Sequence, residues 1–240
     1  MTAVILLILF GLVAVGCLFP LMPLKGRSWL NHHWSRCLMW CCGVRVVPQG
    51  VPVMDDSVFW VANHVSWVDI FVLNSVRTTA FVAKSDIRRW PVIGWLVAGA
   101  GTVFIERGQR QAIRVVGEQM KLRFAQGEVV GLFPEGTTSP GFDVSSFHTS
   151  LFEPAIRAGV AIQPVALRFF CGGERSDYIS FVGEQSLVQN LWRLLGAAGS
   201  AVEVVFLQPL SAQQAGELGR AQVAEYAHVA IRTAVRQGLE

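Results

Sequence analysis

Charged side chains are scarce in this 240-residue chain, and their distribution is uneven. Asp, Glu, Lys and Arg together make up 15% of the residues, hydrophobic residues make up 52%, and the net charge is +3. No charged side chain precedes Lys25, and no acidic one precedes Asp55. Because the net charge is small and no zinc-finger or RNP-type motif occurs, we expect no nucleic-acid partner. The length suffices for one substantial domain with its own core.

Cysteine pairs that would predict a disulfide framework or a zinc site are also missing. The five cysteines are an odd number, four of them precede residue 43, and no C-x-x-C occurs. This usage agrees with a reducing cytoplasm, where such residues serve as small apolar side chains. No ligand cluster has the spacing of a metal site, so we expect neither a metal nor an organic cofactor.

The uncharged N-terminal segment contains an almost wholly apolar run over residues 3–24. At 1.5 Å per residue, such a run can cross or nearly cross a hydrocarbon core of ~30 Å. A signal peptide normally has a basic residue before its apolar run, and none occurs here. In a buried core helix, Pro20 and Pro23 would break the last turn. A retained membrane anchor agrees best, and whether it spans or only enters one leaflet stays open.

Basic and aromatic residues follow the apolar run. The basic residues are Lys25, Arg27, Arg36 and Arg45. By the positive-inside rule they predict that this flank and the following domain lie on the cytoplasmic side. The mixture of Trp and basic residues in 28–42 favours a helix at headgroup level, with a core-packing helix as the alternative. We therefore expect a membrane anchor with an interfacial helix in residues 1–47 and a folded domain in 48–240.

Beyond residue 48, apolar runs of strand length alternate with helical patterns. The expected strands cover residues 58–62, 80–83, 102–105, 129–133, 160–167 and 202–207. The expected helices cover residues 110–126, 151–158 and 218–236. This alternation predicts an α/β fold, with a mixed central sheet flanked by helices and the N-terminal membrane-anchoring helical segment in front. In such folds the chemistry lies in loops at the carboxyl ends of strands.

A histidine and an aspartate follow the first expected strand. His64 comes directly after Asn63, and Asp69 lies five residues beyond His64. If the intervening turn begins a helix, the carboxylate can orient the imidazole and support the imidazolium that forms when it takes a proton. For an isolated pair the commoner interpretation is structural, with His64 capping the helix or filling a polar gap.

Two other expected strands also end in polar residues. Residues 133–141 (FPEGTTSPG) combine glycines with three consecutive hydroxyl side chains. Arg107 follows the strand 102–105 and either holds an anion or pairs with an acid such as Glu106. Taken singly, these features are ordinary turns and strand ends.

Together, and in this order, the clusters resemble the glycerolipid acyltransferase family typified by bacterial lysophosphatidic acid acyltransferase. The matching blocks are NHVSWVD at 63–69, FIER at 104–107, FPEGT at 133–137 and AIQPVA at 161–166. The resemblance covers roughly residues 50–210. Four ordered blocks at suitable separations make a chance match improbable, so the resemblance outweighs the structural interpretation of His64.

The resemblance implies a membrane-bound O-acyltransferase of phospholipid biosynthesis, acting at the cytoplasmic face of a bacterial inner membrane. Its catalytic pair would be His64 and Asp69. The histidine would deprotonate the hydroxyl of a lysolipid, which attacks the acyl group of acyl-CoA or acyl-carrier protein. Substrate-binding residues would be Arg107, Glu135, Gly136, Thr137 and Lys84. Lys84 with its neighbours Arg88 and Arg89 would meet the donor's phosphates or the membrane surface, or form a solvated basic face.

The acceptor lipid depends on one departure from the family pattern. Many relatives that act on lysophosphatidic acid have Arg after FPEGT, whereas this chain has Thr138. We expect 1-acylglycerol-3-phosphate first, giving phosphatidic acid, and lyso-ornithine lipid or another lysolipid without a phosphomonoester as the alternative. A non-catalytic membrane adaptor is the alternative of another class. A serine hydrolase is disfavoured because no G-x-S-x-G occurs. An apolar tunnel near residues 87–97 would set the acyl-chain length.

Overall fold

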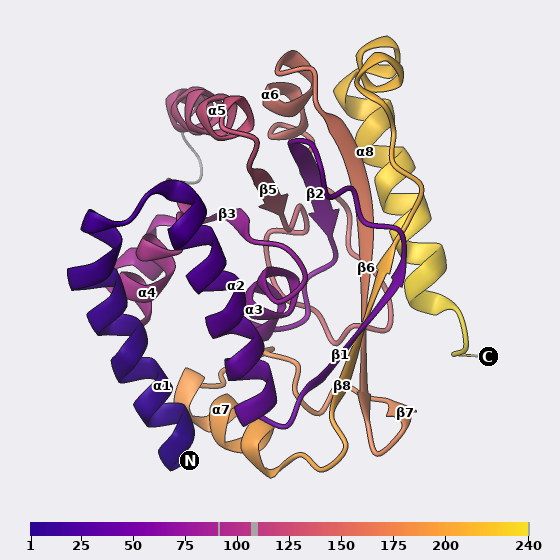
Figure 1. Cartoon of the computed structure of the whole chain (residues 1–240). Coiled ribbons are helices and arrows are strands. Elements are labelled where there is room, and N and C mark those ends of the chain that lie inside the picture. The colour runs from indigo at the N-terminus through magenta and orange to yellow at the C-terminus, as the bar shows by residue number, and fades with distance from the viewer. Residues whose placement is uncertain (91, 107–109, 240) are drawn as a thin grey trace.

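The structure, a computed structural model, describes every residue except 91, 107–109 and 240 (Figure 1). The strands are β1 (Arg45–Gly50), β2 (Val58–Ala62), β3 (Thr79–Lys84), β4 (Val103–Ile105), β5 (Val129–Leu132), β6 (Ala161–Cys171), β7 (Glu174–Arg175) and β8 (Ala201–Phe206). The α-helices are α1 (Thr2–Val13), α2 (Leu24–Cys41), α3 (Val68–Asn74), α4 (Ile93–Gly99), α5 (Arg110–Ala125), α6 (Phe152–Arg157), α7 (Leu187–Gly196) and α8 (Ala212–Arg236).

The strands form one mixed sheet in the order β1-β8-β6-β2-β5-β3-β4, with β7 paired to β6. Strands β6 and β8 are antiparallel, whereas β2 is parallel to both β5 and β6, and β3 is parallel to both β5 and β4. The expected α/β fold with a mixed sheet is confirmed. Because β2, β3, β4 and β5 run in the same direction, the residues that follow them meet at one edge of the sheet.

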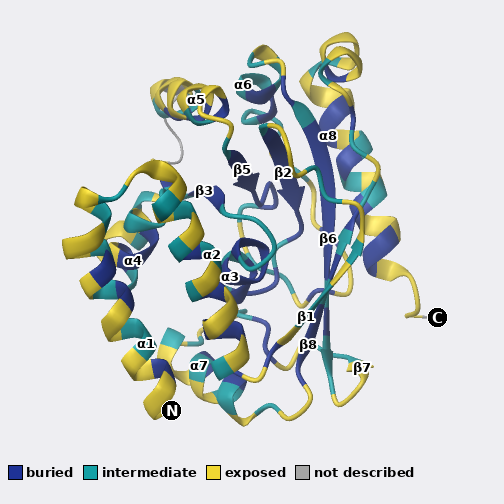
Figure 2. Cartoon of the chain, viewed as in Figure 1, coloured by how far each residue is buried: buried dark blue, intermediate teal, exposed yellow. Residues whose placement is uncertain are grey.

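The sheet lies between two helical layers, and alternating side chains of β2 face each of them. Trp60 belongs to a core cluster with residues of α2, α3 and α7. Phe59 belongs to a second cluster with residues of α5, α6 and α8. Figure 2 shows the central strands buried and the outward surfaces of α1 and α5 exposed. Every residue of β2 is buried, as expected for a strand covered on both faces.

The six expected strands are all present, although β6 continues to Cys171 instead of ending at residue 167. The expected helices correspond to α5, α6 and α8, and α8 begins at Ala212 instead of at residue 218. Strand β1 was not predicted, because its residues are half exposed and it contains Pro48. It lies at the sheet edge beside β8, where a proline is tolerated. The expected boundary between residues 47 and 48 falls inside β1. The short helices α4 and α7 were also not predicted, since neither has a long periodic pattern.

The N-terminal segment is packed against the rest of the fold by one side only. The stretch Thr2–Leu21 has a mean hydropathy of 2.9 and is long and apolar enough to cross a membrane, by length and composition. The indole Nε1 of Trp34 in α2 donates to the Leu7 carbonyl of α1 at 2.9 Å. A Cβ at Gly11 would lie 2.9 Å from that same nitrogen, so glycine permits this close approach. The outward face remains exposed and apolar, which is compatible with membrane association.

Candidate active site

His64 directly follows the point where β2 leaves the sheet. The preceding Asn63 is buried and bridges to β6 through its side chain. Its Nδ2 donates to the Leu167 carbonyl at 3.0 Å, and its Oδ1 accepts from the Leu167 amide at 2.7 Å. The side-chain amide thus extends the pairing of β2 with β6 by one residue. This bridge determines where the backbone leaves the sheet, and therefore where His64 lies.

Asp69 lies in the first turn of α3 and contacts the imidazole of His64. Its Oδ2 is 2.7 Å from His64 Nδ1 and accepts from the amides of Val65 at 2.7 Å and Ser66 at 3.0 Å. Since a carboxylate only accepts, Nδ1 carries the imidazole proton and Nε2 has its lone pair free. The Asp69 side chain is fully buried, while that of His64 is 21% exposed. This is the arrangement of a general base with a buried partner.

The imidazole ring of His64 also stacks on an aromatic pair. Its centroid is 4.2 Å from that of Phe133, with 10° between the planes, and Phe133 stacks on Phe81 at 5.3 Å. Gly131 of β5 makes room for this stack, because a Cβ there would lie 2.5 Å from Phe81 Cε1. An aromatic face attracts a cation, so the stack favours the imidazolium formed during proton transfer.

The carboxylate of Glu135 hydrogen-bonds to the backbone of His64 and of Ser145. Its Oε1 accepts from the His64 amide and its Oε2 from the Ser145 amide, both at 2.8 Å. Burial raises the pKa of the Glu135 carboxyl, and the hydrogen bonds from Ser145 and His64 offset this in part. Both carboxylate oxygens therefore accept hydrogen bonds from the backbone. Glu135 does not line the pocket of about 480 Å³ that lies beside His64. Its expected contact with substrate stays a prediction; its hydrogen bonds show a positioning role.

We expect Glu135→Gln to lower the free energy of unfolding by about 1–3 kcal/mol, the cost of leaving a buried polar group unsatisfied. The glutamine amide would have to face one of the two backbone N–H groups with a donor of its own. Chemical denaturation measures this change.

Glu118→Gln on the exposed surface of α5 is the matched control and should change the unfolding free energy by less than about 0.5 kcal/mol. Equal stability of the two variants would show that the Glu135 hydrogen bonds do not hold the loop.

A pocket of about 480 Å³ opens beside His64. It brings together four of the predicted site residues, namely His64, Lys84, Gly136 and Thr137. The ammonium of Lys84 forms an ion pair with Asp86. Arg107 lies outside the described residues. The apolar wall includes four residues of the range in which a tunnel was expected: Ile87, Trp90, Ile93 and Val97.

A distant segment closes one side of this pocket. The hydroxyl of Thr138 donates to the carbonyl of Phe181, and the Phe181 amide donates to the Val65 carbonyl at 2.9 Å. Phe181 and Thr138 both line the pocket. Sequence reasoning did not find Phe181, because no local pattern indicates which loop is held against residues 64–69, the proposed catalytic turn.

Helix α7 is joined to the catalytic turn by a buried asparagine. The Oδ1 of Asn190 accepts from Trp67 Nε1 at 2.8 Å, and its Nδ2 donates to the Ser180 carbonyl at 2.9 Å. Trp67 lies between His64 and Asp69 in the chain and lines the pocket. No local pattern singled out Asn190, because its bond to Trp67 joins residues 123 positions apart in the chain.

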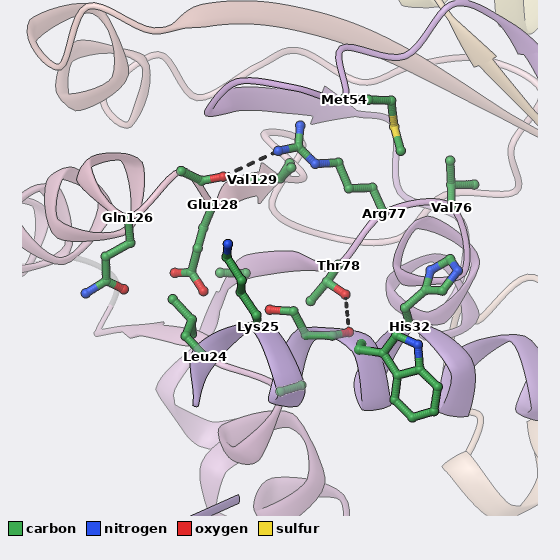
Figure 3. Close-up of a pocket in the computed structure, with 15 residues that line it drawn as sticks. Leu24, Lys25, His32, Met54, Val76, Arg77, Thr78, Gln126, Glu128 and Val129 are labelled. Atoms are coloured by element: carbon green, nitrogen blue, oxygen red, sulfur yellow. Dashed lines mark hydrogen bonds between the residues drawn. The ribbon is translucent and has the colours of Figure 1, made fainter. Parts of the chain in front are cut away.

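A second hollow, of about 460 Å³, is lined by residues that precede β3 and β5 and by the start of α2 (Figure 3). Here the guanidinium of Arg77 donates to the carbonyls of Val53, Asp56 and Gly127, and the hydroxyl of Thr78 donates to the Ser28 carbonyl. These groups join separate segments of the chain. Within the described residues, no cluster of His, Cys, Asp or Glu is arranged to hold a metal ion.

Comparison with known proteins gives a consistent result. The family described as Acyltransferase matches residues 43–168. A lyso-ornithine lipid O-acyltransferase from Pseudomonas aeruginosa is 38% identical over 180 residues, which are 75% of this chain and 68% of that protein. A 1-acyl-sn-glycerol-3-phosphate acyltransferase from Neisseria gonorrhoeae is 36% identical over 162 residues, which are 67% of this chain and 63% of that protein.

A solved structure is similar over nearly the whole fold. The crystal structure of the 1-acyl-sn-glycerophosphate acyltransferase from Thermotoga maritima superposes with a TM-score of 0.61. The match covers 97% of this chain and 95% of that chain at 23% identity. At this level of identity the similarity concerns the fold.

Proposed function

The chain belongs to the acyltransferase family, and on this basis we propose that it transfers a fatty acyl group from a thioester to the free hydroxyl of a lysolipid. It is an O-acyltransferase. The observation that carries the proposal is the contact of 2.7 Å between His64 Nδ1 and buried Asp69, beside a pocket whose lining is largely apolar. This combination suits activation of a hydroxyl borne by a lipid.

In the proposed reaction, Nε2 of His64 takes the proton of the lysolipid hydroxyl. The hydroxyl oxygen forms a bond to the thioester carbonyl carbon, and the bond from that carbon to sulfur breaks. The thiolate then takes the proton from the imidazolium, which restores neutral His64. Asp69 stabilises the imidazolium and keeps its Nδ1 in place throughout. The reaction needs no acyl-enzyme intermediate, no metal and no organic cofactor.

The donor is acyl-CoA or acyl-carrier protein, both of which carry the acyl group as a thioester. The apolar pocket wall formed by Ile87, Trp90, Ile93 and Val97 would receive the acyl chain. Lys84 at the pocket edge, with Arg88 and Arg89 in the following turn, supplies positive charge for the donor's phosphates. Gly136, Thr137 and Arg107 are proposed to bind the acceptor's polar head.

For the acceptor, we place lyso-ornithine lipid ahead of 1-acylglycerol-3-phosphate, reversing the order expected from the sequence. Thr138 brings no positive charge, and its hydroxyl is occupied by the Phe181 carbonyl. A phosphate dianion would gain a charged hydrogen bond from Arg at this position but not from Thr. The relative named for lyso-ornithine lipid also matches a larger share of this chain. 1-Acylglycerol-3-phosphate remains the second candidate, because the 36% identical relative is named for it.

Membrane attachment is proposed to occur through the apolar outer face of α1. A perpendicular span by α1 would draw α2, which packs along it, into the hydrocarbon. Helix α2 carries Lys25, Arg27 and Arg36, and burial of these charges would be costly. This supports insertion into one leaflet. The same basic residues support the cytoplasmic face of a bacterial inner membrane as the location.

An acceptor panel with labelled acyl-CoA tests the function. We expect the wild-type protein to esterify lyso-ornithine lipid about tenfold more efficiently than 1-acylglycerol-3-phosphate, measured as kcat/KM. Thr138→Arg should shift this ratio about tenfold towards the phosphate-bearing acceptor, the worth of one charge-assisted hydrogen bond.

Thr138→Val removes the hydroxyl without adding charge and is the control, so its ratio should stay close to that of the wild type. Use of 1-acylglycerol-3-phosphate alone would establish the second candidate. Release of free fatty acid without ester formation would indicate a hydrolase. No turnover with any lysolipid would favour the non-catalytic adaptor.

A further inference from the structure

Helix α7 presents large apolar side chains to the outside of the molecule. Its inner face is fixed by buried Asn190 and Leu194, and its start is capped by Ser186, whose hydroxyl accepts from the Gln189 amide. On the outer face, Val188 is 75% exposed and Trp192 is 69% exposed. These two residues are four positions apart and therefore share one side of the helix. Because α7 is capped at its start and bonded through Asn190, it holds Val188 and Trp192 in a fixed position.

The exposed pair lies on a helix that contributes to the pocket beside His64. Leu187, the first residue of α7, lines that pocket, and Asn190 bonds to Trp67 of the catalytic turn. Trp90 also lines the pocket and is 38% exposed. Trp95 is 66% exposed on α4, which contributes Ile93 and Val97 to the lining. Exposed tryptophans thus occur in the pocket wall and on α4 and α7, two of the helices that contribute to it.

Helix α1 also presents apolar side chains to the outside of the molecule. Helices α1 and α7 both contribute buried residues to one hydrophobic cluster, through Val4 and Leu194. The exposed apolar residues of α1 are Ile5, Leu6, Leu9, Phe10 and Val13. Neither helix contains Asp or Glu. The exposed apolar faces of α1 and α7 therefore each lack an acidic residue from their own helix.

We propose that the outer face of α7, formed by Val188 and Trp192, is a second bilayer contact that holds the pocket entrance against the lipid surface. Trp prefers the boundary between headgroups and acyl chains, which is where a helix lying on a bilayer places its apolar side. The one charged residue of α7, Arg193, has its guanidinium over the Tyr178 ring at 4.9 Å and adds positive charge for anionic headgroups. The benefit of this contact rests on the proposed function. A lysolipid would enter the pocket directly from the leaflet, without crossing water.

Quenching by brominated lipid tests the contact without any turnover. The full chain is bound to vesicles of phosphatidylethanolamine and phosphatidylglycerol that contain brominated phosphatidylcholine. The emission of Trp192 is obtained as the difference between the wild type and Trp192→Phe. We expect the bromine atoms to quench this difference signal strongly. An unquenched difference signal, with the protein still bound to the vesicles, would overturn the proposal whatever the enzyme's activity.

A kinetic measurement separates membrane contact from a merely structural role. Val188→Gln/Trp192→Gln should raise the apparent KM for the surface mole fraction of lysolipid about tenfold, since two apolar side chains lose their contact with lipid. The same variant should act normally on a short-chain, monomeric lysolipid. Val229→Gln, at a position on α8 that is 52% exposed, is the control and should behave as the wild type in both assays.

Equal losses on vesicle-bound and monomeric acceptors would show that the outer face of α7 serves folding or catalysis, not the bilayer. A dimer of the wild type that the α7 variant dissociates would show that a second copy covers this face. Either result would overturn the proposal.

Discussion

His64→Ala is expected to lower turnover by about 10²–10⁴-fold, the usual contribution of a positioned general base. The variant loses the imidazole that takes the hydroxyl proton. The other described partners of Asp69 are the backbone amides of Val65 and Ser66, which cannot act as a base. The main-chain bonds of residue 64 are retained, because its amide donates to Glu135 at 2.8 Å and its carbonyl accepts from Ser139 at 2.8 Å. The protein should therefore fold and bind vesicles as before.

Initial rates with labelled acyl-CoA and lysolipid vesicles measure this loss, and circular dichroism checks the fold. His33→Ala is the matched control, since His33 is exposed on α2 and its ring lies against Trp29 and His32 of the same helix. It should keep full activity. A His64→Ala rate within tenfold of the wild type would eliminate His64 as the base.

Asp69→Asn is expected to lower turnover by about 10²–10⁴-fold, although the substitution is nearly isosteric. Asp69 Oδ2 accepts from His64 Nδ1 and from the amides of Val65 and Ser66. An asparagine that turns its oxygen to the two amides offers the imidazole no anion to stabilise its charged form. One that turns its NH₂ to Nδ1 stabilises the wrong tautomer, in which Nε2 already carries the proton.

The double variant His64→Ala/Asp69→Asn provides the sharper result. If Asp69 acts through His64, its loss should lower the residual rate of His64→Ala by no more than about threefold, because residues that act as a unit are not additive. Asp55→Asn, on an exposed loop, is the control for removal of a negative charge. A multiplicative loss in the double variant would mean that Asp69 contributes independently of the base.

The sequence predicted those features that local spacing controls. Strand β2 and the five-residue interval from His64 to Asp69 could be recognised because a buried strand and the first turn of a helix are short-range structures. The FPEGT block indicated the turn after β5, and the resemblance to a family gave its chemistry. Helix α5 was predicted almost to its ends because its apolar residues recur with a helical period.

The positions of other site residues depend on contacts between segments far apart in the chain. The hydrogen bond from the His64 amide to Glu135 depends on how β2 and β5 pair in the sheet. Phe181 and Asn190 reach the site only because the segment between β7 and α7 folds back onto the catalytic turn. The residues next to Phe181 and Asn190 in the chain do not indicate that these two residues lie near His64.

By itself, the sequence predicted the apolar N-terminal helix and the α/β alternation, since helical and strand periods act within a few residues. The four blocks that resemble the acyltransferase family identified His64 and Asp69 as the proposed catalytic pair. Only the tertiary structure decided what surrounds that pair. Packing brought Phe133 against the imidazole, placed the Glu135 carboxylate on the amides of His64 and Ser145, and brought Leu187 of α7 into the pocket lining. Such arrangements depend on which surfaces bury one another when the helices close onto both faces of the sheet, and this is a property of the whole chain.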